Sequence, residues 1–152
     1  MLVAVALGSN HGDRAAHLDF AVSRLSSVLA SLRVSRWHET DWVGAEPGAH
    51  PRVLNGAAVG EATLSARELL DALLAIERDR GRDRSLAGAP RTLDLDLILF
   101  GDQILQEPGL IVPHPRFRER RFVLEPLAEI APEMIDPVTG RTAMELLAAL
   151  TA

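Results

Sequence analysis

The amino-acid sequence predicts an α+β fold of the ferredoxin-like class, with a mainly antiparallel sheet. Segments with strand and helix signals follow one another in the order β-α-β-β-α-β between residues 2 and 100, which is the order of that fold. The strand segments are almost entirely apolar, so we expect helices to cover the sheet. A chain of 152 residues has the length of one domain with its own core, and residues 1–152 are predicted to form it.

Apolar spacing and a capping residue define the elements of the first half. Asp13 is placed to cap a helix, and apolar residues from Leu18 to Leu32 recur at the spacing of one helix face. A Gly- and Pro-rich segment between two of the strands indicates a mobile loop. The predicted elements are a strand over 2–7 that ends at Gly8, a helix from Asp13 to about Ser31, a strand over 34–42, a loop over 44–51 and a strand over 54–62.

Capping boxes mark two helices of the second half. Ser65 precedes Glu68 by three residues, and Thr142 precedes Glu145 by the same distance. Gly81 is a natural stop for the first of these helices, and the segment after it is rich in glycine and charge. The predicted elements are a helix from Ser65 to Gly81, a mobile Arg-rich loop over 82–91, a strand over 93–100, Pro-rich turns, a short helix near 118–125 and a last helix from Thr142.

The composition excludes several classes of protein and of site. The net charge of −5 argues against bulk binding of nucleic acid or anionic membranes, and no apolar segment has the length of a membrane span, so we expect a cytoplasmic protein. The absence of cysteine excludes disulfides, thiol nucleophiles and Cys-ligated zinc. All sixteen basic residues are arginine, and without lysine neither a Walker A loop nor a lysine Schiff base can form.

Two carboxylates interrupt the apolar strand over 93–100. Asp94 and Asp96 are two residues apart, so on a strand they project from one face while the neighbouring leucines project from the other. At about 6 Å and an effective dielectric of about 20 the two anions repel by roughly 3 kcal/mol, so we expect cations beside them. Oxygen ligands without cysteine or histidine favour Mg²⁺ over zinc. The alternative is an exposed strand face with Asp–Arg pairs.

Arginine is concentrated in two short segments of this acidic chain. A guanidinium group matches phosphate with two parallel hydrogen bonds, so these clusters together with the acidic pair favour phosphoryl-type transfer. His114 is a candidate donor beside the second cluster. The alternatives are helix ends whose arginines pair with local carboxylates, and a turn histidine between two prolines. The clustered arginines are Arg78, Arg80, Arg82, Arg84 and Arg91, followed by Arg116, Arg118, Arg120 and Arg121.

Four motifs resemble the 6-hydroxymethyl-7,8-dihydropterin pyrophosphokinase family, and they follow its order over nearly the whole chain. The two most specific are PRTLDLDLILFG at 90–101 and VPHPRFRERRFVLEPLAEIAPE at 112–133. They are accompanied by LGSN at 7–10 and LNGAAVGEAT at 54–63. The resemblance implies a ferredoxin-like core with helices on both faces of the sheet, which is a three-layer arrangement.

The resemblance also implies a reaction. Members of this family transfer the pyrophosphoryl group of ATP to the hydroxymethyl oxygen of the dihydropterin and release AMP, in folate biosynthesis. Two Mg²⁺ ions are the implied cofactors, and ATP is the co-substrate. The implied partners are these small molecules, with neither nucleic acid nor membrane, and we expect a monomer.

Matching motif positions imply roles for individual residues. Asp94 and Asp96 are the expected metal ligands, and Asp96 joins Arg82 and Arg91 as an expected catalytic residue. Asn55 would hydrogen-bond the pterin and Phe122 would stack on it, although without the resemblance they read as a turn residue and a core residue. The residues expected at ATP are Glu77, Arg82, Arg84, Arg91, Ile98, His114 and Arg120. The residues expected at the pterin are Thr40, Asp41, Trp42, Val43, Asn55, Asp94 and Phe122.

The chain departs from the family pattern in several places, none of which removes a metal ligand. Gly88-Ala89 stands where Trp-Gly is common, Asp41 follows Thr40 where Pro is common, Val53 replaces an aromatic residue and Gly109 replaces an arginine. These departures leave two alternatives to the enzyme. One is a divergent, non-catalytic protein that binds pterin or nucleotide, and the other is a purely structural ferredoxin-like interaction module.

Overall fold

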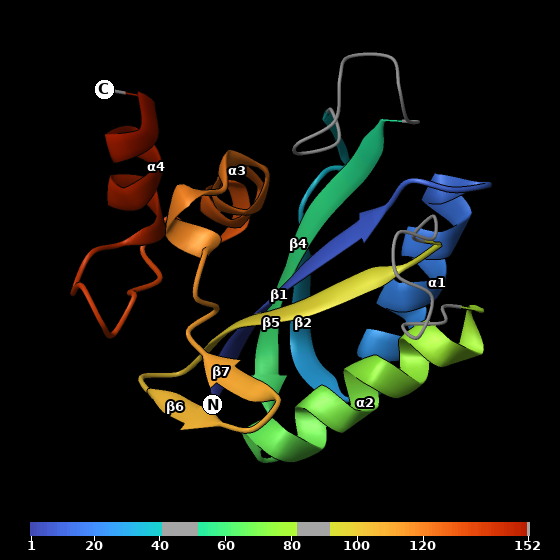
Figure 1. Ribbon diagram of the computed structural model, residues 1–152, viewed down its shortest axis with the longest axis horizontal. Coiled ribbons are helices and arrows are strands. Elements are labelled where there is room, and N and C mark those ends of the chain that lie inside the picture. Colours follow the sequence, from blue (N-terminus) through green and yellow to red (C-terminus); the bar gives the residue numbers. More distant parts are fainter. Residues whose placement is uncertain (41–51, 82–91, 152) are drawn as a thin grey trace.

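The computed structural model describes residues 1–40, 52–81 and 92–151 (Figure 1). The two loops predicted to be mobile, over 44–51 and 82–91, lie outside the described residues. Among the described helices, none is long and apolar enough to cross a membrane.

A single antiparallel sheet organises the fold, and it confirms the predicted class. The strands lie in the order β2-β4-β1-β5, and β3 pairs with the same strand, β4, as β2 does. The helix between β1 and β2 and the helix between β4 and β5 each connect parallel strands with one strand between them, which is the split βαβ arrangement. The elements of this core are β1 (Leu2–Ser9), α1 (Arg14–Leu25), β2 (Leu29–Val34), β3 (His38–Thr40), β4 (Val53–Ala62), α2 (Ala66–Asp79) and β5 (Asp94–Phe100).

Helices cover both faces of the sheet, as the resemblance implies. The helices α1 and α2 lie on one face, and η1 (Phe117–Glu119), α3 (Arg121–Ile130) and α4 (Ala143–Thr151) lie on the other (Figure 1). Along β1, Val3, Val5 and Leu7 face α1 and α2, whereas Ala4 packs toward α3. Because both faces are covered, β1 is apolar at nearly every position and its sequence shows no alternation. A small hairpin, β6 (Leu105–Glu107) and β7 (Leu110–Val112), follows β5.

Local capping signals predict the helix starts correctly. The Asp13 carboxylate accepts a hydrogen bond from the Ala16 N–H at 3.1 Å. In the capping box of α2, the Ser65 hydroxyl accepts from the Glu68 N–H at 3.1 Å and the Glu68 carboxylate accepts from the Ser65 N–H at 2.9 Å. Thr142 and Glu145 form the same pair at the start of α4. Each box satisfies two backbone donors that the helix itself leaves unpaired.

The helix predicted to reach Ser31 ends at Leu25, so that boundary is wrong. Residues Leu29–Val34 form β2 instead, and the pairing of β2 with β4 is irregular between Ala30 and Arg33. Ser31 lies in this irregular stretch with a φ of +53°, in the left-handed region. The irregularity breaks the alternation of a strand, so Leu29 and Leu32 recur at three residues and imitate a helix face.

The strand predicted over 34–42 is divided into the end of β2 and the short β3. Between them the Ser35 hydroxyl accepts from the Ala57 N–H at 2.9 Å, and the ring of Trp37 packs against Gly56. A Cβ atom at position 56 would lie 2.4 Å from that ring, so only glycine lets the indole approach β4 this closely.

The predicted helix near 118–125 is broken at Arg120 into η1 and α3, and α3 continues to Ile130. The prediction ends before Pro126, but a proline inside the helix removes one backbone hydrogen bond and here does not end the helix. The hairpin of β6 and β7 replaces part of the predicted Pro-rich turns. Strands of three residues carry too little alternation to be recognised in a sequence.

A buried carboxylate fixes the turn between α3 and α4. Asp136 is 1% exposed, and its oxygens accept hydrogen bonds from the Arg118 guanidinium at 2.5 and 3.0 Å. They also accept from the Val138 N–H at 3.0 Å and the Thr139 hydroxyl at 2.7 Å. Burial alone would raise the pKa of Asp136, but the hydrogen bonds from Arg118, Thr139 and Val138 outweigh it and lower the pKa.

We predict that Asp136→Asn lowers the free energy of unfolding by about 2 kcal/mol at pH 7, because charge-assisted hydrogen bonds are lost. The carboxylate has a lower pKa in the folded than in the unfolded chain. Its contribution is therefore complete above the unfolded-state value of about 3.9 and disappears as the pH falls through the folded-state pKa. Urea unfolding from pH 7 to pH 3 should show the two proteins converging in acid, and a difference that does not depend on pH would contradict this.

Candidate active site

A cavity of about 320 Å³ opens between the sheet and α3. Its walls come from β1, β3, β4, β5, α3 and the two residues that flank η1, so segments far apart in the sequence meet there. Six of the residues expected at the ATP, metal or pterin sites line this one cavity: Thr40, Asn55, Asp94, Asp96, Arg120 and Phe122.

The acidic pair lies where the pleat of β5 predicts. Leu95 and Leu97 belong to the core beneath α1 and α2, whereas Asp94 and Asp96 are half-buried and line the cavity on the opposite face. On the neighbouring strand, Gly8 is opposite Asp94 and Ala6 is opposite Asp96. The residues of β1 that face the two carboxylates are therefore small.

An irregularity in β5 places His114 near the acidic pair. The register between β1 and β5 shifts after Leu97 and skips Ile98, whose carbonyl accepts a hydrogen bond from the His114 N–H at 2.9 Å. The same outer edge of β5 is covered at Leu95, whose N–H donates to the Glu77 carboxylate of α2 at 2.6 Å. Ile98 and Glu77 are themselves buried and do not line the cavity. Their contacts fix the edge of the strand that carries the aspartates.

The hydrogen bond at the His114 ring identifies the ring nitrogen that carries the proton. Its Nδ1 accepts the backbone N–H of Arg116 at 3.1 Å, so in the neutral ring the proton is on Nε2. Burial is the main cause that lowers the pKa of His114, and the charge of Arg120 adds to it. Asp94 acts in the opposite direction but does not reverse the shift. The ring is therefore neutral at pH 7, with Nε2–H as its donor.

The other end of the cavity offers an aromatic ring and an amide. Asn55 is 5% exposed, and its Nδ2 donates to the Thr40 hydroxyl at 2.6 Å, which fixes the orientation of the amide. Phe122 enters from α3, with the Arg120 guanidinium 5.6 Å from the centre of its ring. An aromatic face with a nearby donor and acceptor is suited to a flat, polar heterocycle.

A charged contact joins the two walls of this end. The Glu129 carboxylate of α3 accepts from the Arg36 N–H at 2.7 Å, and it lies 3.0 Å from the His38 Nε2 of β3. Since Thr40 is on β3 and Phe122 is on α3, this contact keeps both at a fixed separation. The backbone hydrogen bond from Arg36 is the main cause that lowers the pKa of Glu129.

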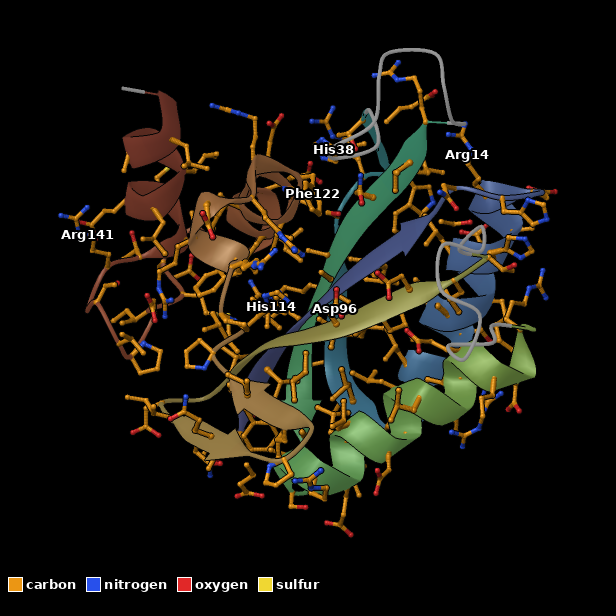
Figure 2. The ribbon with its side chains drawn as sticks, viewed as in Figure 1. Arg14, His38, Asp96, His114, Phe122 and Arg141 are labelled. Carbon is orange, nitrogen blue, oxygen red and sulfur yellow. The ribbon has the colours of Figure 1, made fainter. Side chains whose placement is uncertain are left out.

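A second cavity, of about 340 Å³, meets the first at Asp96. Its walls are largely apolar and come from α2, β5 and β7, and His114 lines it together with Asp96. Figure 2 shows Asp96 and His114 near one another at the middle of the molecule, with Phe122 above them at the start of α3. The acidic strand thus lies between a cavity lined by several polar and charged side chains and a cavity whose lining residues are mostly apolar.

The donor set at this junction suits a cation that completes its coordination with a ligand. In the parts of the chain that the structure describes, no group of three His, Asp or Glu side chains could hold a metal ion. Two carboxylates are nevertheless sufficient for Mg²⁺, which commonly binds one or two of them together with water and substrate phosphates. Asp94 and Asp96 therefore fit Mg²⁺ bound together with a phosphate-containing substrate.

The structure also adds residues that sequence reasoning missed and leaves others undescribed. Ser9 and Asn10 line the first cavity, and their only sequence signal is the motif LGSN. Arg116, which the sequence marks only as a member of the second arginine cluster, lines it too. Val53 lines the first cavity and Gly109 the second, so two departures from the family pattern lie at the site. The expected site residues outside the described parts are Asp41, Trp42, Val43, Arg82, Arg84 and Arg91.

The sequence matches the family model described as 7,8-dihydro-6-hydroxymethylpterin-pyrophosphokinase over residues 4–132. The chain belongs to this family. It is therefore a pyrophosphokinase that transfers pyrophosphate to hydroxymethyldihydropterin in folate biosynthesis, as the sequence predicts.

Related pyrophosphokinases cover nearly the whole chain. The chain is 44% identical to the 2-amino-4-hydroxy-6-hydroxymethyldihydropteridine pyrophosphokinase of Pseudomonas aeruginosa, over 97% of this chain and 90% of that protein. It is also 44% identical to the Bacillus subtilis protein of the same name, over 90% of this chain and 81% of that protein. The identity to the Synechocystis protein of that name is 42%, over 94% of this chain and 73% of that protein.

The fold is similar to that of a longer solved chain. The crystal structure of wild-type Plasmodium falciparum HPPK-DHPS superposes with a TM-score of 0.75 at 13% identity, over 97% of this chain. This chain spans 44% of the length of that one. At such low identity the similarity concerns the fold alone.

We predict that Gly8→Ala weakens pterin binding by about tenfold, which is about 1.4 kcal/mol, without unfolding the pyrophosphokinase. A Cβ atom at position 8 would lie 3.3 Å from the Asn55 Oδ1 and 3.7 Å from Val53, inside the cavity. Calorimetric titration with a pterin analogue measures the affinity. The thermal midpoint serves as the control, and wild-type affinity in the folded variant would show that this part of the cavity does not hold the pterin.

Proposed function

We propose that the pyrophosphokinase uses ATP as the donor and Mg²⁺ bound at Asp94 and Asp96, and that it releases AMP. The observation that carries this proposal is the position of the two carboxylates, which line the first cavity together, while Asp96 also lines the second. A group transferred between ligands in the two cavities has to pass this shared carboxylate.

The first cavity is the proposed pterin site. Phe122 offers its ring for stacking, and Asn55 offers a donor and an acceptor along the edge of the cavity. The Asn55–Thr40 hydrogen bond and the Glu129 contact with His38 hold these groups before the ligand arrives. A pre-formed site orients the hydroxymethyl group toward Asp94 and Asp96 at a low entropic cost.

The second cavity is the proposed site of the nucleotide base. Leu70 and Leu74 of α2 and Leu110 of β7 supply apolar walls for a flat ring. At the polar end, the Nε2–H of His114 can donate to a phosphate oxygen, and Arg120, which lines the first cavity, adds a positive charge that acts on His114. Glu77 and Ile98, expected at the nucleotide, contribute here by fixing the outer edge of β5 and the position of His114.

Mg²⁺ at the two carboxylates supplies charge neutralisation at the transferred phosphates and polarisation of the attacking hydroxyl. We propose two ions, as the resemblance implies. Asp94 and Asp96 hold the cation side of the site, and Asp94 also borders the pterin. Among the described residues, Asp96 is the carboxylate that lines both cavities.

The remaining assignments rest on the resemblance. Arg82 and Arg91 are proposed to stabilise charge during transfer, and Arg84 is proposed as a further phosphate contact. Backbone groups of Asp41–Val43 are proposed to complete the pterin site beside Thr40. We also propose that residues 1–152 act as a single domain and as a monomer. A cytoplasmic location stays a prediction of the sequence.

We predict that Asp96→Asn lowers kcat for AMP formation by about 10²-fold or more, the magnitude typical of a lost preorganised electrostatic contact. The assay is AMP release that depends on hydroxymethyldihydropterin and Mg–ATP. Asp102→Asn is the matched control, because Asp102 is exposed just after the same strand and lines neither cavity.

Three outcomes are informative. Loss of turnover in the Asp96 variant alone supports the assignment, and wild-type turnover in that variant overturns it. Binding of pterin and Mg–ATP by the wild-type protein without AMP release would favour the non-catalytic alternative that the departures at Gly88, Val53 and Gly109 suggest.

A further inference from the structure

An ion pair between Arg118 and Asp136 lies next to the two arginines that line the first cavity, Arg116 and Arg120. Arg118 donates to Asp136 through Nε at 2.5 Å and through a terminal nitrogen at 3.0 Å, so the pair is bidentate. The Asp136 side chain is fully buried, and the Arg118 side chain is 26% exposed. The guanidinium also lies 4.9 Å from the centre of the Phe117 ring, which is itself buried. Arg118 is thus held on two sides.

The two arginines on either side of Arg118 line the first cavity. Arg116 and Arg120 both line the cavity, whereas Arg118 between them is bound to Asp136. The connecting helix η1 has three residues, with turn hydrogen bonds from Glu119 to Arg116 at 3.1 Å and from Arg120 to Phe117 at 3.2 Å. A turn this short has little rigidity of its own, so its orientation depends on contacts outside it.

The partner carboxylate comes from a segment that the family model does not cover. The match ends at residue 132, and Asp136 lies in the turn between α3 and α4. This turn is held by its own hydrogen bonds, from the Asp136 N–H to the Arg141 carbonyl and from the Gly140 N–H to the Asp136 carbonyl, both at 2.8 Å. Asp136 therefore offers Arg118 a fixed anchor.

We propose that Asp136 and Arg118 are positioning residues, which hold η1 so that Arg116 and Arg120 line the first cavity with Asp94 and Asp96 and bind the nucleotide phosphates there. The inference rests on the proposed function, since it assumes that these two arginines face phosphate. Burying a charged pair stabilises a fold little compared with apolar side chains of the same size, but it fixes one relative orientation. The lowered pKa of Asp136 and the raised pKa of Arg118 agree with a tightly bonded pair.

The test compares two variants of the same C-terminal segment. Asp136→Asn keeps the shape of the side chain but removes its charge. Thr142→Ala removes the cap of α4, whose hydroxyl accepts from the Glu145 N–H at 3.1 Å, and keeps both partners of the Arg118–Asp136 pair. Both variants should lower the thermal midpoint. Only Asp136→Asn should raise KM for ATP and the Kd of a non-hydrolysable ATP analogue, by about tenfold. The Kd for a pterin analogue, measured without nucleotide, should change by less than about twofold.

A double-variant cycle keeps the test valid if Asp136→Asn folds poorly. Arg118→Gln should raise KM for ATP as much as Asp136→Asn does, and the double variant should be no worse than either single one. Thr139→Val removes one of the hydrogen bonds to Asp136 and should raise KM for ATP by a smaller factor.

The outcomes separate this inference from the proposed function. If the wild-type protein forms AMP and Asp136→Asn keeps the wild-type KM for ATP, the positioning role is overturned while the function stands. Equal changes in KM in the Asp136 and Thr142 variants would also overturn it, because they would reflect stability alone. If the wild-type protein forms no AMP, the proposed function itself fails, and binding of the ATP analogue then still tests the orientation of η1.

Discussion

The pleat of β5 is the constraint on which the site depends. Successive side chains of a strand project to opposite faces, so Leu95 and Leu97 enter the core beneath α2 while Asp94 and Asp96 face the cavity. The apolar residues anchor the strand, and the anchored strand fixes the carboxylates. A shift of one residue would bury both charges and expose both leucines, so the same packing that stabilises the fold also determines the position of the acidic pair.

Contacts at the outer edge of β5 both stabilise the strand and position a residue of the site. β5 pairs with β1 on one side only, and on its outer side Glu77 accepts from Leu95 while the carbonyl of Ile98 accepts from His114. These contacts satisfy backbone groups that an open edge would leave unpaired, and they bring a neutral histidine next to the carboxylates. In the segment after His114, Arg116 and Arg120 line the first cavity together with the two aspartates. Arg118, between these two arginines, is hydrogen-bonded to Asp136.

Sequence reasoning succeeds where a signal is local. The caps at Asp13, Ser65 and Thr142 involve residues three positions apart, and the common face of Asp94 and Asp96 follows from the period of a strand. It fails where tertiary contacts decide, as at β2, whose irregularity at Ser31 gives it the spacing of a helix. That Asn55 and Phe122 share a cavity with the aspartates is not a property of their local sequence and was expected only from the family resemblance. Asp136, in a turn after α3, carries no signal of burial at all.

The most direct test of the central claim is to locate the bound cation by NMR. Mn²⁺ substitutes for Mg²⁺ and broadens NMR signals of nearby groups. With a non-hydrolysable ATP analogue and a pterin analogue bound, the account predicts selective broadening of the backbone amides of Gly8 and Asn55, which line the cavity with the two aspartates. This broadening should disappear in the Asp94→Asn/Asp96→Asn double variant. Equal broadening at these amides in the double variant, or broadening centred away from β1 and β5, would contradict the account.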